Sequence, residues 1–258
     1  MFALSIDPIR RIAFVPILLI FVGALVAFTG VFSVWVWRNT RCLTRSEEQD
    51  SIFLQADAVE SGAASIRKHL CLHFRTAKPA DLFAAAGALA GFACQMVVRD
   101  QAQLEGRPSG LYEIALADGR LLYSGDVLNG PLAEDAASLW SIVGDGAPVA
   151  DILHMFKDAI AALTEDPESP ILKALVTVVQ RHWPATVAIL DANHVPATFR
   201  HLTIARAIRA VQHSQTGLPP DHVARMVMGA AIVMSKWDPA DVLVPDQAVG
   251  TTPAVAGG

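Results

Sequence analysis

The chain has 258 residues, of which 53% are hydrophobic and 17% charged, with a formal net charge of −5 at pH 7. This apolar content excludes an intrinsically disordered chain and is higher than a soluble domain usually has. The length is sufficient for one large domain or two small ones with buried cores. The composition therefore points to a membrane-spanning segment.

The segment 12–37, IAFVPILLIFVGALVAFTGVFSVWVW, contains no charged residue. As a helix it would be about 39 Å long, which exceeds the roughly 30 Å of a bilayer's hydrocarbon core. A cleaved signal peptide is the alternative, but its apolar region is usually shorter and no Ala-x-Ala site follows. The flanking residues suited to the headgroup region are Arg10, Arg11, Trp35, Trp37 and Arg38. We predict a single uncleaved transmembrane helix in the lipid bilayer.

The orientation of this span depends on small differences in charge. Two arginines precede it, whereas Arg38, Arg41 and Arg45 follow it, so the positive-inside rule favours a cytoplasmic C-terminal domain by one charge. An arginine pair behind a short N-terminal tail is also typical of the opposite orientation. The odd number of cysteines, three, fits a reducing compartment better. Because the composition is rich in Ala and Arg, as in high-GC bacteria, we predict a single-pass protein of a bacterial inner membrane.

A juxtamembrane helix is expected after the span. Apolar residues recur there at steps of four and three, which is typical of a narrow packing seam. The seam residues are Ile52, Ala56, Val59, Ala63, Ile66, Leu70 and His73. Two copies of the chain could associate through this 52–73 seam, but the coiled-coil signal is weak, and we favour packing on the chain's own domain.

A second apolar helix begins at Lys78-Pro79-Ala80-Asp81, where proline suits a first helical turn and an acid suits the positive end of the helix dipole. It extends to about Leu104 and is rich in Ala and Gly, so neighbouring helices can approach closely. Residues 82–98 are uncharged and reach the lower length limit for spanning a membrane. We interpret this helix as the buried centre of the globular domain.

One β-hairpin is predicted near 111–124. The apolar runs 111–116 and 120–124 flank Ala117-Asp118-Gly119, and Asp-Gly between such runs is a strong hairpin signal. Proline and glycine divide the rest into helices expected at 131–143, 148–163, 171–183, 198–215 and 219–237. The predicted fold is mostly α with one β-hairpin. Its segments are a short N-terminal tail 1–11, the transmembrane helix 12–37, the juxtamembrane helix 38–78, the globular domain 79–238 and a disordered tail 239–258.

The heptapeptide KHLCLHF, 68–74, raises the question of a metal site, because His69, Cys71 and His73 all have side chains that bind transition metals. On a strand the three would share one face. On the helix that the seam predicts, His69 and His73 share a face and Cys71 points away. This pair needs further ligands, and no second cluster of recognised spacing is present. His69 and His73 are thus metal candidates only, and no cofactor is predicted.

Two Asp-x-x-His segments are the candidates for catalysis. Asp151 with His154, and Asp191 with His194, would each place a carboxylate beside an imidazole on a helix, as in an oriented general base. The competing interpretation is that the acids cap helices and the histidines lie on the surface. Nucleophile-elbow, dinucleotide-binding, P-loop and zinc-protease motifs are all missing from the sequence. We therefore favour a non-enzymatic protein.

Charge is distributed unevenly along the chain. The segment 113–168 has eleven acidic and two basic residues, whereas 196–236 has five basic residues and one acidic residue. Three arginines of the second segment share one predicted helix with His201 and His213, which we interpret as a solvated face or as a complement to the acidic segment. Because the whole chain is acidic and lacks interleaved aromatic and basic residues, nucleic-acid binding is not expected.

The sequence thus predicts a membrane-anchored interaction or scaffolding module. The first alternative is a membrane-bound enzyme that uses one of the His/Asp pairs. The second alternative is a metal-binding module that uses His69 and His73.

Overall fold

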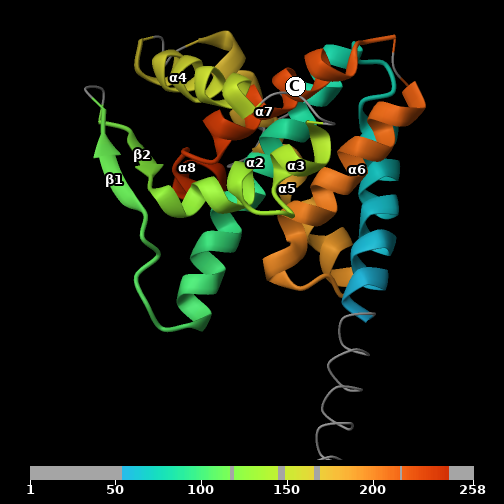
Figure 1. The fold of residues 1–258 in the computed structure, drawn as a ribbon, viewed down its shortest axis with the longest axis horizontal. Helices are drawn as coiled ribbons and strands as arrows, with labels where there is room; N and C mark the ends of the chain where they lie inside the picture. Colours follow the sequence, from blue (N-terminus) through green and yellow to red (C-terminus); the bar gives the residue numbers. More distant parts are fainter. Residues whose placement is uncertain (1–53, 117–118, 145–148, 166–168, 216, 244–258) are drawn as a thin grey trace, which may run out of the picture. The chain divides into compact units, whose positions relative to one another are not determined.

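The computed structural model describes residues 54–116, 119–144, 149–165, 169–215 and 217–243. These residues form a mostly helical fold with one small antiparallel sheet, which confirms the predicted class (Figure 1). The predicted span 12–37 and its flanking arginines and tryptophans lie outside them. One described helix, Pro79–Leu104, is long and apolar enough to cross a membrane by length and composition, but 78% of its apolar window is buried within the fold, as in a core helix.

The elements follow one another along the chain in this order. They are a helix over 54–73, α2 (Pro79–Leu104), β1 (Tyr112–Ala115), β2 (Leu121–Ser124), the short turns η1 (Asp126–Leu128) and η2 (Gly130–Glu134), α3 (Leu139–Val143), α4 (Val149–Glu165), α5 (Pro170–Ala192), the turn η3 (Ala197–Phe199), α6 (Arg200–Gln215), α7 (Pro220–Met234) and α8 (Pro239–Leu243).

Helix α2 has clear start and stop signals. Pro79 occupies the first turn, where its missing N–H costs little, and Asp81 lies near the positive end of the helix dipole. At the other end Gly106 adopts a φ of +63°, and the Arg107 N–H donates to the Ala102 carbonyl at 3.0 Å. This is a Schellman ending, which needs a left-handed residue and therefore favours glycine. The chain is turned back sharply after Leu104.

Helix α2 is the centre of the core and packs most extensively against α7. Gly87 and Gly91 face the α7 backbone, and a methyl group at either position would overlap the carbonyl oxygen of Val227 or Ala231. Because these glycines leave no side chain between the two helices, the backbones lie in direct contact. Close packing of this kind gains dispersion energy along the whole interface.

The helix over 54–73 packs on its own domain. Val59, Ala63, Ile66 and Leu70 of the predicted seam are all buried, whereas Ala56 and His73 are exposed. The seam face lies near Val195 and Thr203, which a side chain at Gly62 would contact. Glu60 also forms an ion pair with Arg206 of α6. Four seam residues are thus used within one chain.

The hairpin pairs Tyr112 with Ser124 and Ala115 with Leu121, within the two predicted strand ranges, and Gly119 has a φ of +85° in the turn. It is attached to the helices through β2. The Tyr123 N–H donates to the Lys236 carbonyl at 2.7 Å, and the Arg99 guanidinium lies 4.2 Å from the centre of the Tyr123 ring. A two-stranded sheet is marginal alone, so these contacts stabilise it.

Three segments differ from the sequence prediction. The single helix expected over 131–143 is divided into η2 and α3, because the Ser138 hydroxyl accepts from the Ser141 N–H at 3.1 Å and starts a new helix. Helix α5 continues through Pro184 to Ala192, since Trp183 and Leu190 on its buried face offset the cost of the proline. Helix α8 lies at the start of the segment 239–258, which was predicted as a disordered tail.

The α2–α7 contact generates a stability prediction. Gly91→Ala is expected to destabilise the protein by at least about 2 kcal/mol, because its methyl group meets immobile backbone. The matched control is Gly229→Ala on α7, where a methyl group meets nothing within 4 Å. That variant should gain about 0.5–1 kcal/mol from helix propensity. Urea unfolding of both variants measures the difference, and equal stability would contradict the proposed contact.

Candidate functional site

The structure brings a third imidazole to the predicted histidine pair. His69 and His73, one turn apart on the helix over 54–73, have ring centres 4.4 Å apart. The ring of His182 from α5 lies 5.5 Å from His69 and 5.3 Å from His73. We name these three residues the histidine cluster. Cys71 is half-buried and packs against the hydrophobic core.

The metal hypothesis required further ligands for His69 and His73. Although His182 joins them, no group of three or more His, Cys, Asp or Glu side chains among the described residues is arranged so that it could hold a metal ion. The histidine cluster is therefore a set of mutually packed imidazoles in this structure. Among the described residues, the structure therefore supplies no complete set of metal ligands around His69 and His73.

Burial and the neighbouring rings lower the pKa values of two of these imidazoles, His69 and His182. Burial, followed by the nearby His69, His73 and Arg181, lowers the pKa of His182 to about 4. Burial and then His73 lower the pKa of His69, whose Nε2 is buried without a hydrogen-bond partner among the described residues. A proton added to one ring would repel a proton on the next.

The two predicted His/Asp pairs lie on different elements, one on α4 and the other at the end of α5. His154 is exposed on α4, which also contains the backbone of Asp151. Asp191 forms an ion pair with Arg200 at 2.6 Å, and His194 follows α5 at an exposed position with a φ of +56°. Neither histidine lines either of the two cavities described below.

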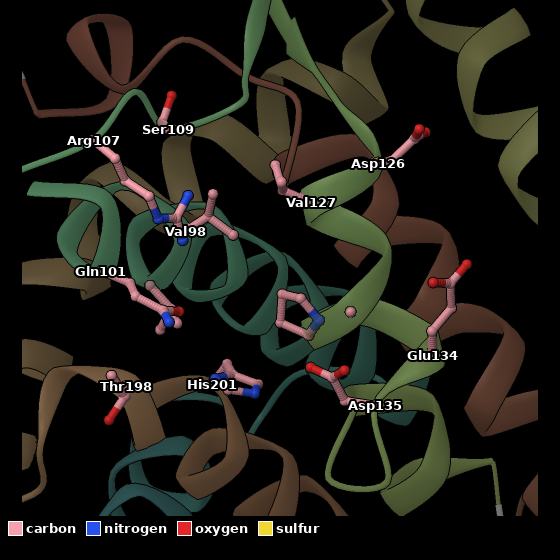
Figure 2. Close-up of a pocket in the computed structure, with 13 residues that line it drawn as sticks. Val98, Gln101, Arg107, Ser109, Asp126, Val127, Glu134, Asp135, Thr198 and His201 are labelled. Atoms are coloured by element: carbon pink, nitrogen blue, oxygen red, sulfur yellow. The ribbon is translucent and has the colours of Figure 1, made fainter. Parts of the chain in front are cut away.

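A polar cavity of about 400 Å³ lies where the end of α2 meets the segment from η1 to Asp135 and the start of α6 (Figure 2). We name it the polar pocket. It is lined by Val97, Val98, Gln101, Arg107, Ser109, Asp126, Val127, Gly130, Pro131, Glu134, Asp135, Thr198 and His201. Its walls thus come from segments about 100 positions apart in the sequence.

His201 is the buried polar side chain of this pocket. It is 8% exposed, and its Nδ1 has no hydrogen-bond partner among the described residues. Figure 2 shows the imidazole and the Asp135 carboxylate pointing toward each other. Burial lowers the pKa of His201 to about 4, although the negative charge of Asp135 acts in the opposite direction. The imidazole is thus neutral at pH 7.

The single arginine of the polar pocket is already held by its neighbours. Arg107 forms an ion pair with Glu105, and the Gln101 amide donates to the same carboxylate at 3.0 Å. By contrast, the side chains of Asp126, Glu134 and Asp135 are exposed and have no hydrogen-bond or ion-pair partner in the part of the chain that the structure describes. The pocket therefore has an excess of negative charge.

A second cavity, of about 390 Å³, is apolar. It lies among α2, α4, α5 and α7, and Asp158 and Arg225 are its charged lining residues. Gly229 leaves open space in its wall. Since no cluster of titratable groups points into it, we take the polar pocket as the candidate site.

Sequence reasoning missed His201, which it placed on a solvated face of α6. The sequence also contains a pattern that is typical of a buried helix face, because His201, Ala205, Ile208 and Gln212 follow one another at steps of four and three. In the structure all four are buried. No protein-family model, curated protein or solved structure is significantly similar to this chain.

The histidine cluster generates a pH prediction. The folded-state pKa of His182, about 4, lies below its ordinary value of 6.5, so the unfolded chain binds the proton first as the pH falls. The contribution of His182 to the free energy of unfolding is therefore fully present above about pH 6.5 and is lost as the pH falls toward about 4. His182→Gln should therefore reduce the slope of melting temperature against pH between pH 7 and about 4.5.

The slope is the readout, because the substitution itself also changes the absolute stability. The control His222→Gln removes an imidazole from an exposed position of α7. His201→Gln should act in the same direction as His182→Gln, since burial lowers both pKa values to about 4. If the slope changes equally in the His182 and His222 variants, the cluster is not its source.

Proposed function

We propose that this chain is a non-enzymatic binding module, anchored in a bacterial membrane by residues 12–37, and that it binds its partner in the polar pocket. The observation that carries this proposal is the imidazole of His201, which is 8% exposed in the wall of an open cavity and whose Nδ1 is buried without a hydrogen-bond partner among the described residues. Buried polar atoms in folded proteins nearly always have a hydrogen-bond partner. A buried imidazole with such an unpaired atom, in the wall of a cavity, indicates a place for a ligand.

The size and lining of the pocket support binding. A volume of about 400 Å³ lies within the range of small-molecule sites, and the lining combines apolar side chains with a few converging polar groups. The amide of Gln101 comes from the end of α2, the carboxylates come from η1, from η2 and from Asp135 directly after it, and the imidazole comes from α6. The hydroxyls of Ser109 and Thr198 come from the loop after α2 and from η3, so several elements that pack on α2 contribute to the lining. A ligand would meet a largely preformed site.

The chemistry of His201 favours binding over catalysis. A general base is most effective when its pKa lies near the working pH, whereas burial lowers the pKa of this imidazole to about 4. The hydroxyl of Ser109, a pocket residue, accepts a hydrogen bond from the Leu111 N–H at 3.2 Å and has no contact with the imidazole that would activate it. A neutral imidazole beside carboxylates is well suited to holding a ligand by hydrogen bonds.

The membrane anchor leads to a fractionation prediction. The full chain should remain with membranes after an alkaline carbonate wash. Arginines in place of Ala24 and Leu25, at the centre of the span, should release the protein, because each charge costs about 2.5–3.5 kcal/mol on insertion scales. The control Leu54→Arg changes a side chain that is 71% exposed and should stay membrane-bound. Retention of the double variant would exclude the anchor.

The pocket is tested by photo-crosslinking in native membranes. A benzophenone amino acid at Thr198, an exposed pocket residue, should give a discrete adduct, whereas the same group at Thr177, exposed on α5 outside the pocket, should not. His201→Gln should weaken the Thr198 adduct at least about tenfold, as expected for loss of a buried hydrogen bond to a charged group. Equal adducts from both positions, insensitive to the His201 change, would exclude the pocket as the binding site.

A further inference from the structure

We infer that the polar pocket binds a primary ammonium group on a short alkyl stem, either a free amine or a lysyl side chain. This inference rests on the proposed function, because it names the chemistry of the ligand for the same site. It follows from the charges of the lining residues, from the hydrogen-bonding capacity of His201 and from the apolar part of the wall.

The side-chain charges of the pocket favour a cation. Asp126, Glu134 and Asp135 contribute three carboxylates without partners among the described residues, whereas Arg107 is paired with Glu105 outside the lining. The helix dipoles do not change this sign, because the negative end of α2 and the positive end of α6 both meet the pocket and act in opposite directions. An anion would be repelled by the carboxylates.

His201 supplies a directional contact that a charge cluster alone lacks. The carboxylate of Asp135 favours a positive charge next to it, but burial prevents the imidazole from carrying that charge at neutral pH. A ligand ammonium can supply it. With Nδ1 protonated, the Nε2 atom of the same ring can accept an N–H from the ligand, and the Asp135 carboxylate points toward this imidazole (Figure 2).

The rest of the wall suits an alkyl stem. Val97, Val98, Val127 and Pro131 present apolar surface in the same cavity as the carboxylates. A chain of methylene groups can lie along such surface while its charged end reaches the polar side, as lysine stems do. The volume of about 400 Å³ limits the ligand to a small amine or one side chain of a larger partner.

The first test is calorimetric titration of the full chain in detergent with three probes of similar length. 1,4-Diaminobutane should bind, whereas the neutral 1,4-butanediol and the dianion succinate should bind at least about tenfold more weakly. Raising the NaCl concentration from 50 to 500 mM should weaken diamine binding, because the carboxylates are exposed to solvent. Binding of the diamine no tighter than that of the diol overturns the inference.

Asp135→Asn tests the assignment to this pocket. It removes one charge at an exposed position, so folding is not at risk, and it should weaken diamine binding about tenfold. The matched control Asp57→Asn removes an exposed carboxylate from the helix over 54–73, which is not part of the pocket, and should leave binding unchanged. Equal loss in both variants would mean non-specific attraction and would overturn the inference.

A second titration distinguishes the two sources of the ammonium group. The probe is acetyl-Gly-Lys-Gly-amide, compared with the same peptide containing norleucine in place of lysine. Tighter binding of the lysine peptide than of the diamine supports a protein partner, and the reverse supports a free amine. If lysine and norleucine peptides bind equally, the ammonium is not recognised and the inference fails.

Failure of this inference is separable from failure of the proposed function. Binding of the diol or succinate that is lost in His201→Gln would keep the pocket as a binding site and reject only the cation. If no probe binds and the Thr198 crosslink is also missing, both are rejected. If no probe binds while the crosslink depends on His201, the pocket stands and its ligand is not an alkyl ammonium.

Discussion

The direct backbone contact between α2 and α7 is the constraint on which the other features depend. Gly87 and Gly91 allow it, and residues bulkier than glycine at these positions would overlap carbonyl oxygens of α7. Because α2 is enclosed by α5, α6 and α7, its C-terminal end is fixed relative to the start of α6. That relation places Val98 and Gln101 opposite His201 and so creates the polar pocket.

The ending of α2 contributes as much as its packing. The left-handed Gly106 reverses the chain, so Arg107 and Ser109 return along the helix end and line the pocket. The same reversal leads into the hairpin, which Arg99 and Lys236 hold against the helices. The conformation of Gly106 therefore ends α2, and it also directs the chain first along the wall of the pocket and then into the hairpin.

The helical class, the hairpin and the buried central helix were predictable because short stretches of sequence contain the signals for them. Asp118-Gly119 specifies the turn, and proline with a following acid specifies the start of α2. The candidate site was not predictable in this way, since Gln101, Asp135 and His201 meet only through tertiary packing. The sequence contains the four-three spacing of the buried face on which His201 lies. The arginines at 200, 206 and 209, however, led to the interpretation of this helix as a solvated face. The helix through Pro184 also depends on tertiary burial, which overrides local propensity.

The ion pairs of the structure show which acidic residues pair with arginines of the basic segment 196–236. The basic segment was interpreted as a solvated face or as a complement to the acidic segment 113–168. In the structure Arg206 pairs with Glu60 and Arg200 with Asp191, so two basic side chains are engaged by acids outside that segment. Asp126, Glu134 and Asp135 are left without such partners among the described residues. Their negative charge is gathered at the mouth of a cavity whose buried imidazole is neutral, and a positive charge from outside the described fold would balance it.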